Sequence, residues 1–147
     1  MKSFLFPDVN VWLALTHDRH AHHATARQWL DSERDAQLYF CRFTQLGLLR
    51  LLTNEQVMAE DVLSQRKAWQ AYRRWLEDGR IAFHREPESA EFEALFEDLS
   101  TRSHPATKLW ADAYLAAFAK SCGLTLVTFD RALERTRQVG VRILSAG

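Results

Sequence analysis

The sequence has few of the features that mark a secreted or membrane-bound protein. Only two of its 147 residues are cysteines, Cys41 and Cys122, and they form no CxxC pair. A chain of this length can bury a core without disulfide staples, so both thiols are expected to stay reduced, as is typical of the cytosol. No apolar run approaches the roughly 18 residues of a membrane span, and we expect no secretory signal before the first strand. We therefore predict a cytoplasmic protein without membrane contact.

Net charge is also missing, because 19 basic residues balance 19 acidic ones. This balance does not favour a protein that coats nucleic acid broadly, but it leaves open an enzyme that holds nucleic acid at a local patch. The hydrophobic content of 47% and charged content of 26% are ordinary for a soluble globular protein. The length predicts one domain, residues 1–147, and no internal repeat or low-complexity stretch divides it.

Apolar runs alternate with helical patterns along the chain. Strands are expected at residues 3–6, 36–41, 80–84, 124–128 and 141–144, and helices at 11–15, 20–32, 44–52, 61–76, 89–100, 108–122 and 131–135. This alternation predicts an α/β fold with a mostly parallel central sheet and helices on both faces. Thr44 and Asp61 are predicted N-caps, and Gly79 and Gly123 are predicted to end the helices before them.

Three aspartates, far apart in sequence, each stand where an apolar strand meets a helix. Asp8 and Asp130 follow expected strands, and Asp112 lies in the first turn of the helix expected at 108–122. In parallel sheets such positions meet at one edge, where helix N-termini also favour anions. Carboxylates are costly to bury alone and become tolerable when they share a cation. The pattern predicts a small metal-dependent enzyme that acts on a phosphate-containing substrate.

Structural explanations compete with this prediction at several positions. Asp8 and Asp130 could simply cap the helices that follow them, and Asn10 and Thr128 could either cap or support a site. Gln45 is more typical of a helix-surface amide than of a ligand.

Two further clusters carry alternative interpretations. The histidines at positions 17, 20, 22 and 23 lack nearby cysteines and the usual zinc-finger spacing, so a solvated helix start is favoured over a metal site. A basic run with interleaved aromatics covers residues 66–80. Its default interpretation is a solvated face over an aromatic core seam, and the alternative is a surface that contacts RNA or a protein partner.

Three stretches together resemble the PIN domain, and specifically its VapC-type toxins from bacterial toxin–antitoxin pairs. They are FPDVNVWLAL at 6–15, WADAYLAAFA at 110–119 and LVTFDR at 126–131. In the resemblance, Asp8 is the first acid of the metal site, Asp112 the key acid and Asp130 the final one, with Thr128 as a helper hydroxyl. The order of the motifs is that of the family, and they span nearly the whole chain.

The resemblance implies a PIN-like three-layer sandwich and a Mg2+- or Mn2+-dependent endoribonuclease. It implies an RNA substrate, a small antitoxin partner and a homodimer. Asp8 and Asp112 are then the expected direct ligands, while Asp130 binds a second ion or orients a water.

Four further residues are assigned supporting roles around these acids. Asn10 and Thr128 are expected to hydrogen-bond the carboxylates or a water. Arg50 or Arg131 is expected to hold a phosphate oxygen, because a guanidinium can donate two parallel hydrogen bonds.

One position departs from the family pattern. PIN domains usually carry a glutamate on the helix after the second strand, and Gly47 stands at that place here. Its loss lowers the charge of the site and puts a second metal ion in doubt, so a catalytically weak PIN module that binds RNA or protein is the alternative function. A haloacid dehalogenase-like phosphohydrolase is disfavoured, because it needs an aspartate where Asn10 stands. Restoring a glutamate at position 47 is expected to strengthen Mn2+ binding.

Overall fold

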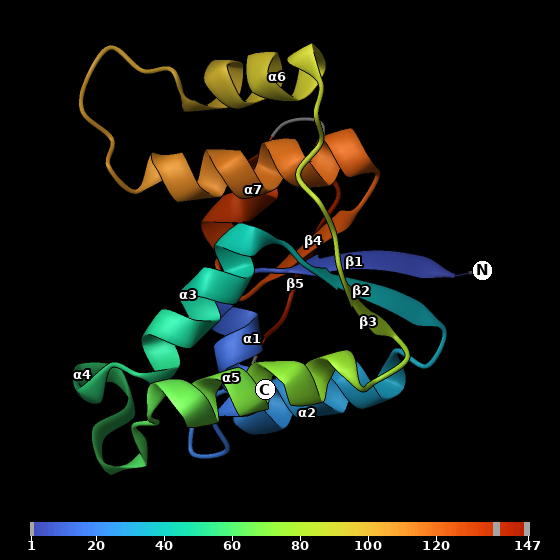
Figure 1. The fold of residues 1–147 in the computed structure, drawn as a ribbon. Helices are drawn as coiled ribbons and strands as arrows, with labels where there is room; N and C mark the ends of the chain where they lie inside the picture. Colours follow the sequence, from blue (N-terminus) through green and yellow to red (C-terminus); the bar gives the residue numbers. More distant parts are fainter. Residues whose placement is uncertain (1, 137–138, 146–147) are drawn as a thin grey trace.

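The computed structural model describes residues 2–136 and 139–145 (Figure 1). Five parallel strands form one sheet in the order β3-β2-β1-β4-β5. The strands are β1 (Ser3–Pro7), β2 (Ala36–Phe40), β3 (Ile81–Phe83), β4 (Thr125–Thr128) and β5 (Val141–Ile143). The helices are α1 (Val9–Thr16), α2 (His23–Ser32), α3 (Arg42–Leu52), α4 (Glu55–Met58), η1 (Ala59–Asp61), α5 (Gln65–Leu76), α6 (Ala90–Ser100), α7 (Leu109–Cys122) and η2 (Arg131–Arg135).

Helices cover both faces of the sheet. Figure 1 shows α6 and α7 stacked on one face, while α1, α2, α3 and α5 lie on the other. Successive strand residues point to opposite faces, so Leu5 packs in the core beneath α1 while its neighbour Phe6 packs against Phe118 of α7. Both side chains are almost fully buried. This arrangement confirms the predicted three-layer α/β sandwich, and the sheet is wholly parallel among the described residues.

Several helix boundaries differ from the predictions. The helix expected at 20–32 begins at His23, because the residues before it form turns in which the amides of His20 and His23 donate to carbonyls three residues back. Cys41, rather than Thr44, occupies the N-cap of α3, and the Thr44 hydroxyl accepts a hydrogen bond from the Cys41 amide at 2.9 Å. The prediction placed the cap three residues too late, because it did not expect a cysteine there.

The start of α5 was also misplaced. Ser64 caps this helix by accepting from the Lys67 amide, whereas Asp61 belongs to η1 and its carboxylate contacts the His17 ring at 3.1 Å. The short helix α4 was not predicted at all. Gly123 does end α7, in the left-handed conformation that glycine adopts without strain. Within the described residues, no helix has both the length and the hydrophobicity to cross a bilayer.

Candidate metal centre

Asp8 stands between the end of β1 and the start of α1. Its amide donates to the Val127 carbonyl of the neighbouring strand β4 at 2.9 Å, which fixes its backbone at the edge of the sheet. One carboxylate oxygen caps α1 by accepting from the Val11 amide at 3.1 Å. The other oxygen accepts a hydrogen bond from the Thr128 hydroxyl. The Asp8 side chain is buried. The same carboxylate therefore serves both as the N-cap of α1 and as a member of the candidate site.

Thr128 ties two of the three acids together. It is the last residue of β4 and is fully buried. Its hydroxyl donates to the Asp8 carboxylate and accepts from the Asp130 amide at 3.0 Å. The exposed Asp130 carboxylate in turn caps η2 by accepting from the Ala132 amide at 2.9 Å. The capping explanation therefore holds for both Asp8 and Asp130, and their shared hydroxyl places them on one edge of the sheet.

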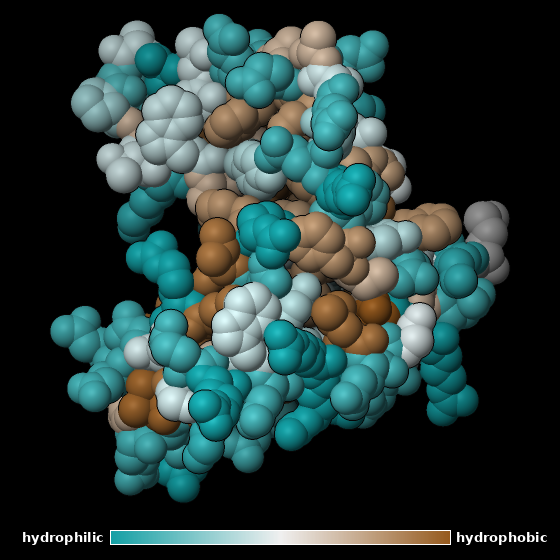
Figure 2. Space-filling view, viewed as in Figure 1, coloured by the Kyte–Doolittle hydropathy of each residue, from teal (hydrophilic) through white to brown (hydrophobic). Residues whose placement is uncertain are grey.

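Asp112 approaches this edge from α7. It lies in the first turn of that helix and is half-buried. Its side chain makes no hydrogen bond or ion pair with any described residue, and it lines a cavity of about 370 Å³ between α6, α7 and η2. Arg102, on the segment after α6, lines the same cavity. Figure 2 shows the surface hollowed between the part built on α6 and α7 and the part below it.

The three acids influence one another electrostatically. Burial raises the pKa of Asp8, and the negative charge of Asp112 raises it further, against the opposing hydrogen bonds from Thr128 and the amide of Val11. Burial likewise raises the pKa of Asp112, and the charge of Asp130 adds to the effect. These effects link Asp112 to Asp8 and Asp130 to Asp112, which is consistent with the prediction that the three acids share one region of the molecule. Uncompensated negative charge at this place is what a bound cation would stabilise.

The spacing of the three acids limits how many of them could bind one divalent ion. Among the residues that the structure describes, no three His, Cys, Asp or Glu side chains lie close enough together to hold one ion. Mg2+ commonly takes only one or two protein carboxylates and keeps several waters. The coupling of Asp112 to Asp8 on one side and to Asp130 on the other is consistent with that preference.

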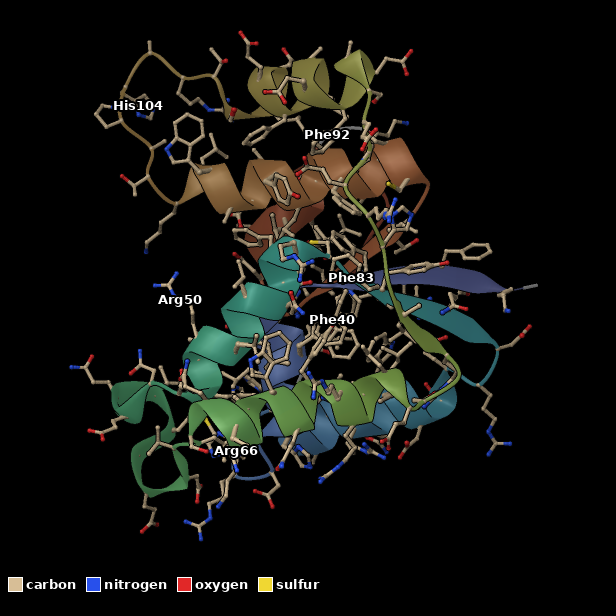
Figure 3. All side chains as sticks on the ribbon, in the orientation of Figure 1. Phe40, Arg50, Arg66, Phe83, Phe92 and His104 are labelled. Carbon is tan, nitrogen blue, oxygen red and sulfur yellow. The ribbon has the colours of Figure 1, made fainter. Side chains whose placement is uncertain are left out.

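Gly47 of α3 lies against the beginning of α1. A Cβ atom at this position would come within 2.5 Å of the Val9 side chain, a distance that packed atoms do not adopt. Gly47, Val9 and Arg50 line a common cleft of about 290 Å³. Figure 3 shows Arg50 projecting outward from α3. Glycine in place of the family glutamate thus allows α3 to pack closely against α1, directly beside Asp8.

The other predicted supporting residues fall into two groups. Arg50 lies next to the site through the cleft it shares with Val9, whereas Arg131 is exposed on η2 and makes no ion pair with another described residue. Asn10 is exposed, and its backbone, rather than its side chain, hydrogen-bonds the Asp8 carboxylate. Sequence reasoning did not single out Arg102. A lone arginine in a loop carries no signal, and only the fold brings it to the cavity of Asp112.

The histidine cluster organises the connection between α1 and α2. The Asp61 carboxylate contacts the ring of His17, and the Ala14 carbonyl contacts that of His23 at 2.7 Å. His22 stacks on Phe129, the residue before Asp130, with ring centroids 4.7 Å apart. These contacts explain the histidines as structural residues that hold the loop against the end of β4.

The basic run and Gln45 also receive structural explanations. On α5, Arg73 lies over the partly exposed Trp69 ring at 5.5 Å, while Tyr72 is buried in the core, in keeping with a solvated face over an aromatic seam. The expectation that Gln45 lies on the helix surface is wrong, because the residue is buried and its amide oxygen accepts from Arg42 at 2.5 Å. Its place on the inner side of α3 depends on how this helix packs in the folded protein, which the sequence alone does not show.

Replacing Thr128 by valine tests the link between the acids. The change keeps the shape of the side chain but leaves the Asp130 amide and one Asp8 oxygen without their partner, so we expect a loss of about 1–3 kcal/mol in the free energy of unfolding. Because the hydroxyl lowers the pKa of Asp8, its removal should shift metal binding to higher pH. Urea unfolding and metal titration at several pH values measure both effects. Thr125→Val, the same change at the start of β4, is the control, and an equal loss there would refute the link.

A family model, that of the PIN domain, matches residues 5–139. The chain is 42% identical over 146 residues to Ribonuclease VapC41 of Mycobacterium tuberculosis, covering 96% of this chain and 99% of that protein. The chain belongs to the PIN-domain family, in its VapC branch. Ribonuclease VapC38 of the same species is 29% identical over 130 residues, covering 84% of this PIN-domain chain and 82% of the relative.

Solved structures show that this PIN-domain chain shares its fold with bacterial toxin proteins. VapBC2 from Rickettsia felis, bound to a DNA fragment from its promoter, superposes with a TM-score of 0.67 at 12% identity, covering 97% of this chain and 99% of that one. VapC20 of M. tuberculosis, a sarcin–ricin loop cleaving toxin, gives 0.64 at 18% identity, with coverage of 93% and 98%. At these identities the likeness establishes the fold. PIN-domain ribonucleases generally use divalent metal ions.

Proposed function

We propose that this VapC-branch protein is a metal-dependent endoribonuclease that acts as the toxin of a toxin–antitoxin pair and restrains growth by cleaving RNA. The observation that carries the proposal is the Thr128 hydroxyl, which hydrogen-bonds both Asp8 and Asp130, together with Asp112, whose charge raises the pKa of Asp8 and whose own pKa is raised by burial and by Asp130. The 42% identity to Ribonuclease VapC41 over nearly the whole chain supports the same activity.

The chain's own residues divide the work in this proposal. Thr128 and the Val11 amide orient the Asp8 carboxylate, and Asp112 lines the cavity without a hydrogen-bond partner in the described part of the chain. Asp8 and Asp112 would hold Mg2+, or Mn2+, with Asp130 positioned for a second ion or a water. The chemistry that a bound ion supplies is polarisation of the scissile phosphate and activation of a water nucleophile. Arg102 and Arg50 flank the acids and would hold phosphate oxygens.

The partners proposed are an RNA substrate and a small antitoxin, in the cytoplasm. Solved relatives with this fold include VapBC complexes from Rickettsia felis and Salmonella typhimurium, which supports an antitoxin partner. Bound to this protein, the antitoxin is expected to block the cavity of Asp112 and to inhibit cleavage.

We propose further that the protein forms a homodimer through α3. Phe43 and Leu46 on this helix are 38% and 51% exposed, and the Phe83 side chain on the edge strand β3 is 36% exposed. Exposed apolar side chains that cluster on one face are typical of subunit interfaces. Leu46→Glu is expected to convert a dimer to a folded monomer in sedimentation equilibrium. Val57→Glu, at another exposed apolar position on α4, is the control; a wild-type monomer at micromolar concentration would contradict the proposal.

Cleavage of total bacterial RNA tests the proposed activity. The purified protein is incubated with Mg2+, with Mn2+ or with EDTA, and the 5′ ends of the products are mapped. We expect discrete fragments only with metal, because the acids need a cation to approach a phosphate. A folded protein that binds metal but leaves every RNA intact would argue against the activity.

A catalytically weak PIN module that binds RNA or protein is the second candidate. The observation in its favour is Gly47, whose contact with Val9 leaves no room for the family glutamate unless the Val9 side chain or one of the two helices moves. Absence of both cleavage and metal binding in that assay would favour this candidate.

A further inference from the structure

Trp110 exposes its indole ring beside the candidate metal centre. The ring is 60% exposed, the highest exposure of any large apolar side chain among the described residues. Within the described part of the chain its one aromatic contact is edge-on, with the Phe96 ring centroid 6.4 Å away. Trp110 also lies two residues before Asp112 on α7. An indole this exposed is available for stacking.

The ring borders a cavity of about 600 Å³ between α6, the residue 101–107 segment and α7. Figure 1 shows this segment arching away from the two helices, and Figure 3 shows His104 on the arch. The aromatic and apolar part of the lining comes from Phe96, His104, Pro105 and Trp110. Flat rings around a cavity of this size suit a planar ligand of the dimensions of a nucleobase.

Arg102 connects this cavity to the metal centre. It lines the cavity of Trp110 and also the 370 Å³ cavity of Asp112. Trp110 and Asp112 are two residues apart, or about 200° around the helix axis, so they point to nearly opposite sides of α7. A strand whose phosphate lies at Asp112 would therefore pass Arg102 and reach Trp110 around the start of the helix. Groups that suit phosphates and a base thus follow one another along this path, which favours a nucleic acid over a protein as the occupant.

The polar part of the lining is rich in hydrogen-bond acceptors. The Ser100 hydroxyl donates to the Phe96 carbonyl at 2.7 Å, and the Thr101 hydroxyl donates to the Glu97 carbonyl at 2.6 Å. Their hydrogens are thus used at the end of α6, and Glu93 and Glu97, two exposed residues of the same lining, can add carboxylate acceptors. A carboxylate recognises a base through its N–H groups. Guanine presents two adjacent N–H groups on one edge, whereas uracil presents one N–H between two carbonyls.

We propose that the cavity at Trp110 binds one unpaired guanine of the RNA substrate, stacked on the indole and close to the phosphate held at Asp112. The proposal rests on the ribonuclease function and deepens it by naming a base that the enzyme selects. Stacking on Trp110 supplies the affinity, the carboxylates of Glu93 and Glu97 supply the preference, and Arg102 positions the connecting phosphate.

Binding of two fluorescent RNA heptamers, UUUGUUU and UUUUUUU, tests this subsite. All proteins carry Asp112→Asn, so that the RNA stays intact in Mg2+, and anisotropy gives the dissociation constants. We expect the guanine heptamer to bind about tenfold more tightly than the uridine heptamer. Trp110→Ala should remove this preference and weaken binding about tenfold or more, since base stacking on an aromatic ring has that effect. Trp110→Phe should retain most of the affinity.

Trp69→Ala is the matched control, because Trp69 is a partly exposed tryptophan on α5. Equal binding of both heptamers, an unaffected Trp110→Ala protein, or an equal loss in Trp69→Ala would each overturn the guanine subsite. These results are separable from failure of the function, which is measured as wild-type cleavage of total RNA. Loss of antitoxin binding alone in Trp110→Ala would show that the cavity serves a protein and would also overturn the proposal.

Discussion

Asp112→Asn is expected to reduce metal-dependent RNA cleavage about a thousandfold and, in metal-free buffer, to raise the melting temperature. The loss follows because a metal ligand contributes several kcal/mol of charge stabilisation, at about 1.4 kcal/mol for each factor of ten in rate. The asparagine has nearly the same shape, and the Asp112 side chain has no hydrogen-bond partner among the described residues to lose. The fold should therefore persist.

The gain in stability follows from the direction of the pKa shift. Burial raises the pKa of Asp112 in the folded protein above its ordinary value of 3.8. Between the ordinary and the raised value the folded state binds more protons than the unfolded state, so stability falls as the pH rises through that window. Above the raised pKa the whole penalty is present, and asparagine removes it. The same sign holds for Asp8, whose pKa burial also raises.

Differential scanning calorimetry with and without Mg2+ measures the second half of this prediction. Mg2+ should raise the melting temperature of the wild-type protein and have little effect on Asp112→Asn. Asp98→Asn is the matched control, because Asp98 is an exposed carboxylate that lines the same cavity. A well-folded Asp112→Asn protein that cleaves RNA at the wild-type rate would remove Asp112 from the metal site.

Gly47→Glu is expected to destabilise the protein by about 1–3 kcal/mol, the usual cost of overpacking, and to fail to tighten Mn2+ binding. The new Cβ would meet Val9 at 2.5 Å, and Val9 directly follows Asp8. The glutamate introduced at position 47 to supply a fourth carboxylate would thus displace Val9 and, with it, the Asp8 carboxylate. This expectation replaces the simpler one drawn from the sequence, in which the glutamate only adds charge.

Removing the obstruction should restore the family pattern. Val9→Ala deletes the two methyl groups nearest to the Gly47 position. The Val9→Ala/Gly47→Glu protein is therefore expected to bind Mn2+ more tightly than Val9→Ala alone, as measured by calorimetry. Gly79→Glu is the control, because a Cβ there meets no atom within 4 Å. A stable Gly47→Glu protein with stronger Mn2+ binding would show that Val9 moves aside freely.

The fold was largely predictable because its signals are local. Short apolar runs that alternate with amphipathic helices specify parallel strands covered on both faces, and the structure confirms this at β1, where Leu5 and Phe6 face opposite layers. Helix starts were less predictable. The actual cap at Cys41 and the use of Asp61 as a partner of His17 depend on which side chains meet in space.

The sequence alone determined the family and the succession of strands and longer helices along the chain. It also identified the three acids as candidates, because each acid marks a strand–helix junction that the local pattern reveals. Only the tertiary structure decided that Thr128 joins Asp8 to Asp130, that Asp112 has no partner among the residues the structure describes, and that Gly47 abuts Val9. It also brought Arg102 to the cavities of Asp112 and Trp110. The physical reason is that these contacts join residues from elements distant in sequence, and the packing of the sheet and its helices determines their distances.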